Sequence, residues 1–575
     1  GLAGPYTLIT NENLPNVRGL AAIYGLTFIP GTWVNNISLS KGTGTVVNGF
    51  ESIAGQIDVG LHVPEDMDKV YLNAYANEGG RLELNANVSS KVNDNWSTAL
   101  LLHAKDNIAR NDRNKDGFLD NPLTQQYIAL NRWHYTAANG YRGQFGVKGT
   151  YFDNLGGQTS FNVDDEGTAK YWGLHQNVKR IEAWSKTGKV YTEMPWKSMG
   201  LQLYGTIHDQ ESYFGLRQHD ATQNSLYANF IYNSIIGTTN HKFKTGASLQ
   251  YDNYTELFDS LNYDRVESVP GVFFEYTYNQ SEKIDVVLGL RADYHNQFGM
   301  FYTPRMHLRY ALGTNTVARL SGGRGQRTAN ILAENSGLLA SSREIVILGD
   351  GSDKPYGLEP EVAWNYGVNL TQKFELDYRD GSFSVDFYRT DFENQIVVDL
   401  DRNPQQAIFY NLQGESYSNS FQAQFDYELI KRLDLRLAYR WYDVRTSYSG
   451  RLRSKPFVST NRAFANIGYE NRYAWKFDYT VNWQGEKRIP DTDSNPQQYQ
   501  LEKLSPDFFV MNAQVSKTWR EKFEIYVGVE NLLDYKQDDP ILASADPFGE
   551  YFDASMIWGP IFGRMTYAGL RYTIK

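Results

Sequence analysis

The chain has 575 residues, a formal net charge of −10 and no cysteine. Without cysteine, disulfides and thiolate metal sites are excluded, and the acidic balance argues against a general nucleic-acid partner. No segment approaches the roughly 18 to 20 consecutive apolar residues of a membrane-spanning helix, which leaves a β-barrel as the membrane option, because its strands turn polar side chains into a lumen and keep mean hydropathy low, here −0.53.

Residues 1–62 differ from the rest of the chain. The segment FIPGTWVNNISLSKGTGTVVNGFESIAGQIDV (28–59) combines short apolar runs with many glycines, and it lacks the long alternation of strands and loops found further on. This composition predicts a small mixed α/β unit placed before a larger β domain.

The segment NDRNKDGFLDNP (111–122) has the spacing of a calcium-binding loop, D-x-N-x-D-G-x-x-D. The predicted ligands are the side chains of Asp112, Asn114, Asp116 and Asp120 and the carbonyl of Phe118, with Gly117 permitting the tight turn. Leu123 stands where a complete loop has a bidentate Glu, so the expected affinity is modest and suited to extracellular calcium levels. A structural calcium ion would stiffen a long outer loop; the alternative is a solvated acidic loop built on Asx turns.

Two later segments alternate with the period of two that is typical of a β-strand. In KIDVVLGLRADYH (283–295), one face carries Ile284, Val286, Leu288, Leu290 and Tyr294, and the other carries Arg291, Asp293 and His295. In RMHLRYA (305–311), Met306, Leu308 and Tyr310 oppose Arg305, His307 and Arg309. Charge confined to one strand face, opposite an apolar face, favours the wet lumen of a membrane barrel over a packed interior.

Histidines on the lumen face are candidate metal ligands. His295 and His307 flank the loop NQFGMFYTP (296–304) and are expected to approach each other near the outer rim, while His103 also points inward. Together with Met300, these imidazoles could bind copper or another soft transition metal, or an axial haem position. Arg305 and Arg309 could hold an anionic ligand. The alternative is that these side chains only hydrogen-bond or pair with neighbouring strands or with a domain inside the lumen.

The clearest alternation lies between residues 420 and 484. SFQAQFDYEL (420–429), KRLDLRLAYRW (431–441) and KFDYTVNWQ (476–484) each place apolar and aromatic side chains on one face and polar or charged ones on the other. The outer faces carry aromatics, as a lipid-facing girdle does, and the chain's 41 Tyr and 12 Trp suit such interfaces. Short turns alternate with long polar segments at 104–123, 338–360, 484–506 and 536–560, a pattern typical of outer-membrane barrels.

The chain ends in the strand-like segment MTYAGLRYTIK (565–575). An exposed strand edge invites pairing with another strand, so a last strand that stops without a tail predicts a partner, which in a closed barrel is the first strand. We therefore expect residues 563–575 to pair with a strand near Lys69 to Tyr75.

Several segments resemble one family. ISLSKGTGTVVNGFESIAGQIDV (37–59), preceded by a proline-containing turn, resembles the closing half of the plug domain of TonB-dependent outer-membrane receptors, and GLAGPYTLITNENLP (1–15) resembles the middle of such a plug. VVLGLRADYH (286–295), YTPRMHLRYAL (302–312), ARLSGGRGQRTANI (318–331), EIYVGVENLLDYKQ (524–537) and GRMTYAGLRYTIK (563–575) resemble barrel strands of these receptors. PRMHLRYA and GRGQRTAN look most similar to receptors of the Bacteroidota type.

The resemblance implies an all-β fold, a transmembrane antiparallel barrel of about 22 strands with a partial α/β plug in its lumen. Residues 1–64 would be the C-terminal half of the plug and residues 68–575 the barrel. The TonB box and the first half of the plug are expected to lie ahead of this sequence. Such a protein sits in the outer membrane of a Gram-negative bacterium and imports a scarce ligand such as a ferric siderophore, haem, cobalamin or a metal ion.

The implied partners are outer-membrane lipid, the TonB complex, the small-molecule or metal-chelate ligand and a surface lipoprotein that covers the mouth. No organic cofactor is expected, and HExxH, GxSxG and P-loop motifs are absent, so an enzyme is not expected. Two other classes of protein remain open at this point: a passive pore or surface adhesion or scaffold barrel with a relic plug, and a secreted β-rich enzyme or carbohydrate-binding protein.

Overall fold

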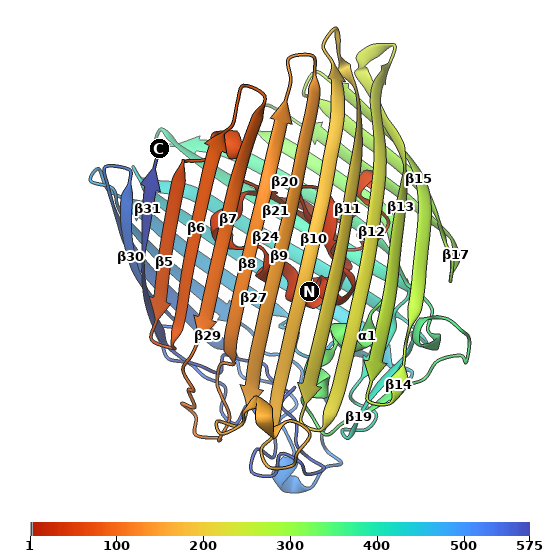
Figure 1. Cartoon of the computed structure of the whole chain (residues 1–575), viewed down its shortest axis with the longest axis vertical. Coiled ribbons are helices and arrows are strands. Elements are labelled where there is room, and N and C mark those ends of the chain that lie inside the picture. Colours follow the sequence, from red (N-terminus) through yellow and green to blue (C-terminus); the bar gives the residue numbers. More distant parts are fainter. Residues whose placement is uncertain (1, 3) are drawn as a thin grey trace.

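The computed structural model, which describes residue 2 and residues 4–575, is a closed β-barrel (Figure 1). The wall is one closed sheet of 24 strand segments. Two of them, β14 and β26, have two and four residues and pair with the same strand as the longer segment that follows each, which leaves 22 spanning strands. The expected barrel of about 22 strands is confirmed.

Strands that follow one another in the wall pair antiparallel, so each backbone polar group finds a partner within the sheet, as a chain crossing lipid requires. The wall strands are β5 (Val70–Asn77), β6 (Arg81–Lys91), β7 (Trp96–Asn107), β8 (Leu123–Thr136), β9 (Tyr141–Gly157), β10 (Gly173–Tyr191), β11 (Met194–Phe214), β12 (Arg217–Ile236), β13 (Thr238–Phe258), β14 (Leu261–Asn262), β15 (Arg265–Gln280), β16 (Ile284–His295), β17 (Gly299–Ala311), β18 (Thr316–Arg327), β20 (Glu361–Leu376), β21 (Arg379–Asn394), β24 (Ser416–Ile430), β25 (Leu433–Tyr448), β26 (Arg451–Ser454), β27 (Asn461–Glu470), β28 (Trp475–Gln484), β29 (Phe508–Trp519), β30 (Phe523–Glu530) and β31 (Met565–Ile574).

The last strand closes the barrel against the first. β31 pairs antiparallel with β5, from Tyr567 opposite Asn77 to Ile574 opposite Val70. The pairing expected near Lys69 to Tyr75 is therefore confirmed, and the edge of the final strand is covered by the sheet itself.

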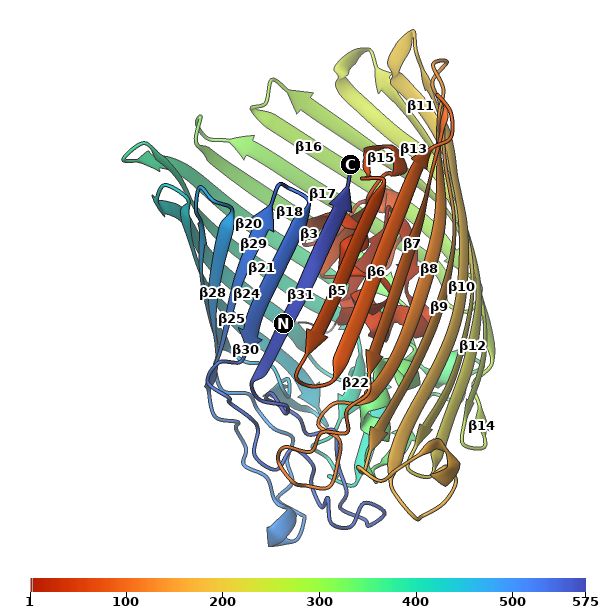
Figure 2. The same cartoon turned by 60° about the vertical axis from the view of Figure 1, so that its left-hand side comes forward.

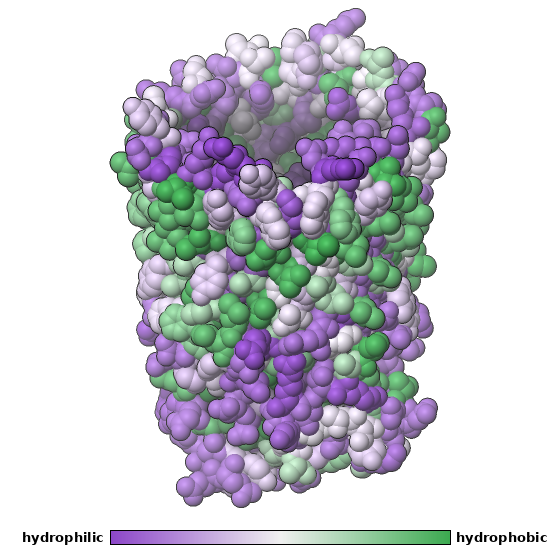
Figure 3. Space-filling view, turned by 90° about the vertical axis from the view of Figure 1, so that its left-hand side faces the viewer, coloured by the Kyte–Doolittle hydropathy of each residue, from purple (hydrophilic) through white to green (hydrophobic). Residues whose placement is uncertain are grey.

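The alternating faces read from the sequence are the faces of the wall. On β28, Phe477 and Tyr479 are 42% and 39% exposed on the outside, while Asp478 and Asn482 belong to the opposite face. Figure 3 shows the result on one side of the barrel, an apolar belt that is bordered by polar surface at both ends. This belt is the lipid-facing surface of the barrel.

The two ends of the barrel carry connections of different length. Short turns, such as 192–193, 377–378 and 431–432, lie at the end that also holds the C-terminus, the upper end in Figures 1 and 2. Long segments, such as 328–360, 485–507 and 531–564, lie at the lower end. Because outer-membrane barrels have short periplasmic turns and long extracellular loops, the lower end faces the outside of the cell.

The N-terminal residues form a small domain inside the bore (Figures 1 and 2). Its sheet has the order β2-β1-β4-β3, with β1 (Thr7–Asn11) and β4 (Gly55–Leu61) parallel and β2 (Leu14–Val17) and β3 (Val34–Lys41) antiparallel to their neighbours. Among the described residues of this plug, the helical turns are 3-10 rather than α, and the longest, Gly19–Phe28, is interrupted at Gly25, whose φ is 51°. The segment from Leu61 to Val70 links plug and wall.

The plug packs against one side of the wall. Apolar clusters join it to strands from β7 to β21; Trp33 and Val59, for example, meet Leu101 of β7 and Leu130 of β8. We call strands β7–β21 (residues 96–394) the plug-facing wall. Strands β24–β31 (residues 416–574), which contribute to none of these clusters in the described chain, are called the far wall.

The extracellular loops fold together over the lower end of the bore. They include α1 (Ile331–Glu334) and a three-stranded sheet of β19 (Glu344–Ile347), β23 (Gln406–Asn411) and β22 (Ile396–Asp399). Their largest apolar cluster includes Phe118, Trp172, Leu332, Phe409 and Phe552. The opposite, periplasmic end is hollowed, as Figure 3 shows at its top. In the described part of the chain, no helix has the length and apolar character needed to cross a bilayer.

Candidate functional site

The extracellular end of the bore is closed where the plug, the wall and one long loop meet. The loop between β18 and β20, residues 328–360, is named the mouth loop, and it carries α1. Ala333 of α1 packs with Leu20 of the plug and Tyr254 of β13 in a buried apolar cluster. One loop therefore touches both the plug and the wall.

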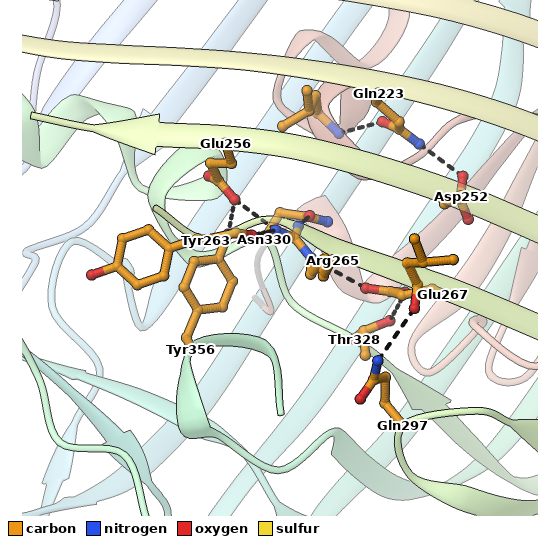
Figure 4. A network of polar contacts seen from close by, with 12 residues as sticks. Gln223, Asp252, Glu256, Tyr263, Arg265, Glu267, Gln297, Thr328, Asn330 and Tyr356 are labelled. Atoms are coloured by element: carbon orange, nitrogen blue, oxygen red, sulfur yellow. Dashed lines mark hydrogen bonds and ion pairs between the residues drawn. The ribbon is translucent and has the colours of Figure 1, made fainter. Parts of the chain in front are cut away.

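Arg265, at the start of β15, is the centre of a buried polar network beneath the mouth loop (Figure 4). Its Nη1 donates to Glu256 Oε2 at 2.7 Å and its Nε to Glu267 Oε1 at 3.3 Å. The guanidinium lies 4.0 Å from the ring centroid of Tyr254, a cation–π contact. A buried ion group of this kind is stable only as a set, because removing one member leaves an uncompensated buried charge.

Three side chains of the mouth loop complete this network. Asn330 accepts from Arg265, Thr328 Oγ1 donates to Glu267 Oε2 at 3.0 Å, and Tyr356 donates to Glu256 Oε2 at 2.5 Å (Figure 4). Burial raises the pKa of the Tyr356 hydroxyl well above its usual range, which keeps that group a donor. The mouth loop is thus fastened to charged groups of the wall.

The plug is fastened to β12 and β13, close to the Arg265 network. Gln223 Oε1 accepts from the backbone N–H of Leu20 at 2.9 Å, and its Nε2 donates to Asp252 Oδ1 at 3.0 Å (Figure 4). Arg18 of the plug donates to the other oxygen of Asp252 at 2.5 Å. Because Asp252 and Glu256 are both on β13, the plug and the mouth loop share one strand as their support.

A second junction joins the plug to the two wall residues that flank the mouth loop, Arg327 of β18 and Glu361 of β20. Tyr6 of the plug donates to Glu361 Oε1 at 2.7 Å, and Arg327 donates to both Glu361 and Glu334. Burial raises the pKa of the Glu334 carboxyl, although the guanidinium of Arg327 opposes that shift. A displacement of the plug would therefore disturb hydrogen bonds on both sides of α1.

The predicted histidine pair does not form. His295, fully buried near the extracellular end of β16, lies with Nε2 3.6 Å from Glu267 Oε2 and so borders the Arg265 network. His307 lies opposite Val287, eight positions along β17 from Gly299, the residue opposite His295. Eight strand residues span about 27 Å. Two residues on either side of a hairpin meet only when they are equally far from the turn, and these two are not.

The other proposed metal ligands are also separated. Met300 is opposite Tyr294 and is 48% exposed on the outer face, so the alternation that sends His295 inward sends Met300 toward lipid. His103 is on β7, where its Nδ1 lies 2.8 Å from Asn85 Oδ1. Within the described chain, no three His, Cys, Asp or Glu side chains are arranged to hold a metal ion.

The two arginines proposed for an anionic ligand bind the protein itself. Arg305 donates to the plug carbonyls of Thr45 at 2.6 Å and Phe50 at 3.3 Å. Arg309, near the periplasmic turn, donates to Asp285 Oδ2 at 3.1 Å. Arg305 therefore fits the alternative prediction from the sequence, in which lumen arginines hold a domain in the bore. Its partners are carbonyls rather than carboxylates.

The proposed calcium loop folds as a compact turn between β7 and β8. Asp112 accepts from the backbone N–H of Asp116 and Gly117, and Asp120 Oδ2 accepts from that of Arg113 at 2.7 Å. Burial, followed by repulsion from Asp112 and Asp116, raises the pKa of the Asp120 carboxyl. The carboxylates bond to loop amides and, in the described structure, are not gathered into a group that could hold a metal ion, so the calcium assignment stays a prediction.

The mouth network could not be found from sequence alone. Arg265 and Glu267 lie two positions apart and so share a strand face, which is the only local signal. Glu256 reaches them across a strand pair, and Thr328, Asn330 and Tyr356 reach them from a loop that has no repeating pattern.

A closed barrel of 22 spanning strands with an apolar belt and a domain in its bore is an integral outer-membrane protein. A family model described as TonB dependent receptor-like, beta-barrel matches residues 61–532. The chain therefore belongs to the family of TonB-dependent receptors, which are receptors rather than enzymes.

Solved structures share this fold at low sequence identity. The siderophore receptor PirA from Acinetobacter baumannii aligns with a TM-score of 0.77 at 13% identity, over 99% of this chain and 90% of that one. A ferric enterobactin receptor (PfeA) mutant from Pseudomonas aeruginosa gives 0.75 at 12% identity over the same shares, and the copper transporter OprC gives 0.76 at 14% over the same shares. A search of curated proteins gives no significant match.

Proposed function

We propose that this receptor imports a metal chelate, such as a ferric siderophore, haem or cobalamin, or a metal ion, into the periplasm. One observation carries the proposal: a plug fills part of a barrel too wide to be left open, and hydrogen bonds link that plug to the loop that closes the extracellular mouth through two wall residues, Glu361 and Arg327. The names of the similar structures, a siderophore receptor, a ferric enterobactin receptor and a copper transporter, agree with this class of ligand.

The arrangement supports import in two stages. For the ligand to reach the bore, the mouth loop must release Glu256, Glu267 and Arg265. For the ligand to leave, the plug must release the wall, and its ionic contacts, such as Arg18 with Asp252, resist that until the TonB complex pulls on the plug. A surface lipoprotein above the loops would act on the first stage.

Uptake measurements test the proposal. Cells carrying the receptor should accumulate radioactive iron or copper, supplied as chelates at nanomolar concentration, only when TonB is present, and deletion of the receptor should remove that uptake. Elemental analysis of receptor purified from its own membrane would identify the metal. Uptake that persists without TonB would favour a passive pore, and a protein that extracts without detergent would contradict the membrane assignment.

We also propose that calcium binds the 111–122 loop through Asp112, Asn114, Asp116, Asp120 and the Phe118 carbonyl. The support is the ligand spacing, the positive φ of 87° at Gly117 and the raised pKa of Asp120. A bound cation would neutralise the repulsion between Asp120 and the neighbouring Asp112 and Asp116 that contributes to this raised pKa. Removal of calcium by EGTA should increase hydrogen exchange in this loop, with the mouth loop as the internal control. Equal exchange with and without EGTA would exclude the site.

A further inference from the structure

Two arginines on the far wall differ from Arg436 and Arg571, which lie on the same lumen face and pair with acids. Arg440 on β25 is directly opposite Arg462 on β27. In the described structure, neither forms an ion pair with a carboxylate. Two like charges opposite each other on antiparallel strands destabilise the sheet unless something neutralises them.

Two other lumen arginines of the far wall pair with cross-strand acids. Arg436 is opposite Asp426, with Nε 2.5 Å from Oδ1, and Arg571 is opposite Glu524, with Nη1 2.6 Å from Oε1. At the next arginine positions, amides take the place of the acids: Gln422 is opposite Arg440, and Gln484 is opposite Arg462. The lumen row therefore reads Gln422, Arg440, Arg462, Gln484 across four adjacent strands.

The amides satisfy hydrogen bonds without supplying charge. Arg440 directs its Nε to Gln422 Oε1 at 2.9 Å, and its Nη2 bonds to the same oxygen. The amide oxygen thus accepts two hydrogen bonds from one guanidinium, an arrangement that suits a carboxylate or phosphate. Arg462 Nε is buried and has no hydrogen-bond partner among the described atoms.

The row lies just inside the extracellular mouth. Gln484 is the last residue of β28 and Arg462 the second of β27, both at the extracellular ends of their strands. A third cation, Lys487, follows in the next loop, where it bonds to the carbonyl of Trp558 in the loop above. Burial, and then the charge of Arg462, lower the pKa of Lys487, so the two groups are close enough to repel.

We propose that Arg440 and Arg462, flanked by Gln422 and Gln484, bind an oxyanion group of the imported ligand once it has passed the mouth. This inference rests on the proposed import function and narrows its ligand to an anionic molecule. Oxyanion oxygens would replace Gln422 Oε1 as acceptors and would neutralise the repulsion between the two guanidinium groups.

Isothermal titration of the full-length receptor in detergent, at low ionic strength, with citrate and with pyrophosphate as probes, tests the site. The wild type should bind a probe with an affinity that falls as salt rises. Arg440→Gln and Arg462→Gln should each weaken binding at least about tenfold, because each removes charge-assisted hydrogen bonds. Arg436→Gln is the matched control: it removes the same charge from the same strand face, but from a neutralised pair, so binding should stay within about twofold.

Melting temperature separates an anion site from a structural role. Because the two guanidinium groups repel, Arg462→Gln should leave the melting temperature unchanged or raise it. Binding lost together with a lowered melting temperature would overturn the proposal. So would wild-type protein that binds neither probe at millimolar concentration. Arg440→Gln and Arg462→Gln variants that bind like the wild type would overturn it as well. Binding in detergent needs no TonB, so a receptor that binds citrate through these arginines yet imports nothing would refute import and leave the anion site standing.

Discussion

Arginines on the plug-facing wall and on the far wall lie on the same lumen face of the barrel but have different surroundings. On the plug-facing wall, Arg305 and Arg265 are buried and bind plug carbonyls or wall acids and the mouth loop. On the far wall, Arg436 is 57% exposed in its side chain and bonds to one cross-strand acid. The comparison teaches that the role of a lumen arginine depends on which groups of the plug, the loops and the neighbouring strands lie next to it. Strand alternation does not predict those groups.

The largest effect is expected at the mouth. Arg265→Gln leaves Glu256 and Glu267 buried without their cation, a loss of about 3 to 5 kcal/mol, so the mouth loop should open. Because the chain has no cysteine, a single Leu332→Cys, at a buried position in α1 of the mouth loop, can report this by its reaction with an impermeant maleimide. Labelling should rise at least about tenfold, whereas Arg389→Gln, which breaks an exposed ion pair with Asp391, should leave it unchanged. Equal labelling in both backgrounds would contradict the fastening role.

The next effect concerns the seat of the plug. Arg305→Ala removes hydrogen bonds to the carbonyls of Thr45, Phe50 and Ser52. The Phe50 carbonyl still accepts from the backbone N–H of Gln326, and the loss at the other two should cost about 3 kcal/mol. We expect a larger conductance in planar bilayers and higher sensitivity of cells to large antibiotics. Arg436→Ala on the far wall should cost less than about 1 kcal/mol and change neither measurement. The comparison between the walls fails if the two variants behave alike.

A smaller, purely steric effect of a glycine substitution should also differ between the two walls. A Cβ at Gly325 would lie 2.4 Å from Ser52 O and 2.9 Å from Ile53 Cα of the plug backbone, whereas at Gly468 on the far wall the nearest atom is 4.0 Å away. Gly325→Ala should therefore displace the plug at a cost of about 1 to 3 kcal/mol. Gly468→Ala should fold and conduct like the wild type. Conductance and thermal unfolding check both variants.

The smallest effect is local to the 111–122 loop. The pKa of Asp120 is raised in the folded loop, so without calcium the loop is most stable below the ordinary aspartate value of about 3.9 and loses stability as pH rises through the higher folded pKa. Calcium should reverse the trend near neutral pH. Hydrogen exchange, corrected for intrinsic rates, should show both trends in the wild type and neither in Asp120→Asn. A loop with the same pH profile in both proteins would contradict the assignment.

Local pattern was enough for the wall but not for the sites on it. Alternation placed Phe477 and Tyr479 outside and sent His295 inward, and the need of a strand edge for a partner led to the β31–β5 pairing. The same reasoning brought His295 and His307 together, because it compared faces and ignored height along the strands. It also counted Met300 among the ligands, although its own alternation places that side chain in lipid.

The sequence by itself determined the two faces of the strands and the closing strand pair, and the family resemblance added the outer-membrane barrel. A period of two can be read locally, because lipid on one side and water on the other enforce it at each residue. Only the tertiary structure decided which charges are neutralised. Arg265 finds its acids on another strand and its hydrogen bonds in a distant loop, and Arg440 meets Arg462 instead of a carboxylate. Such encounters depend on strand register and loop folding, which couple residues that no local pattern relates.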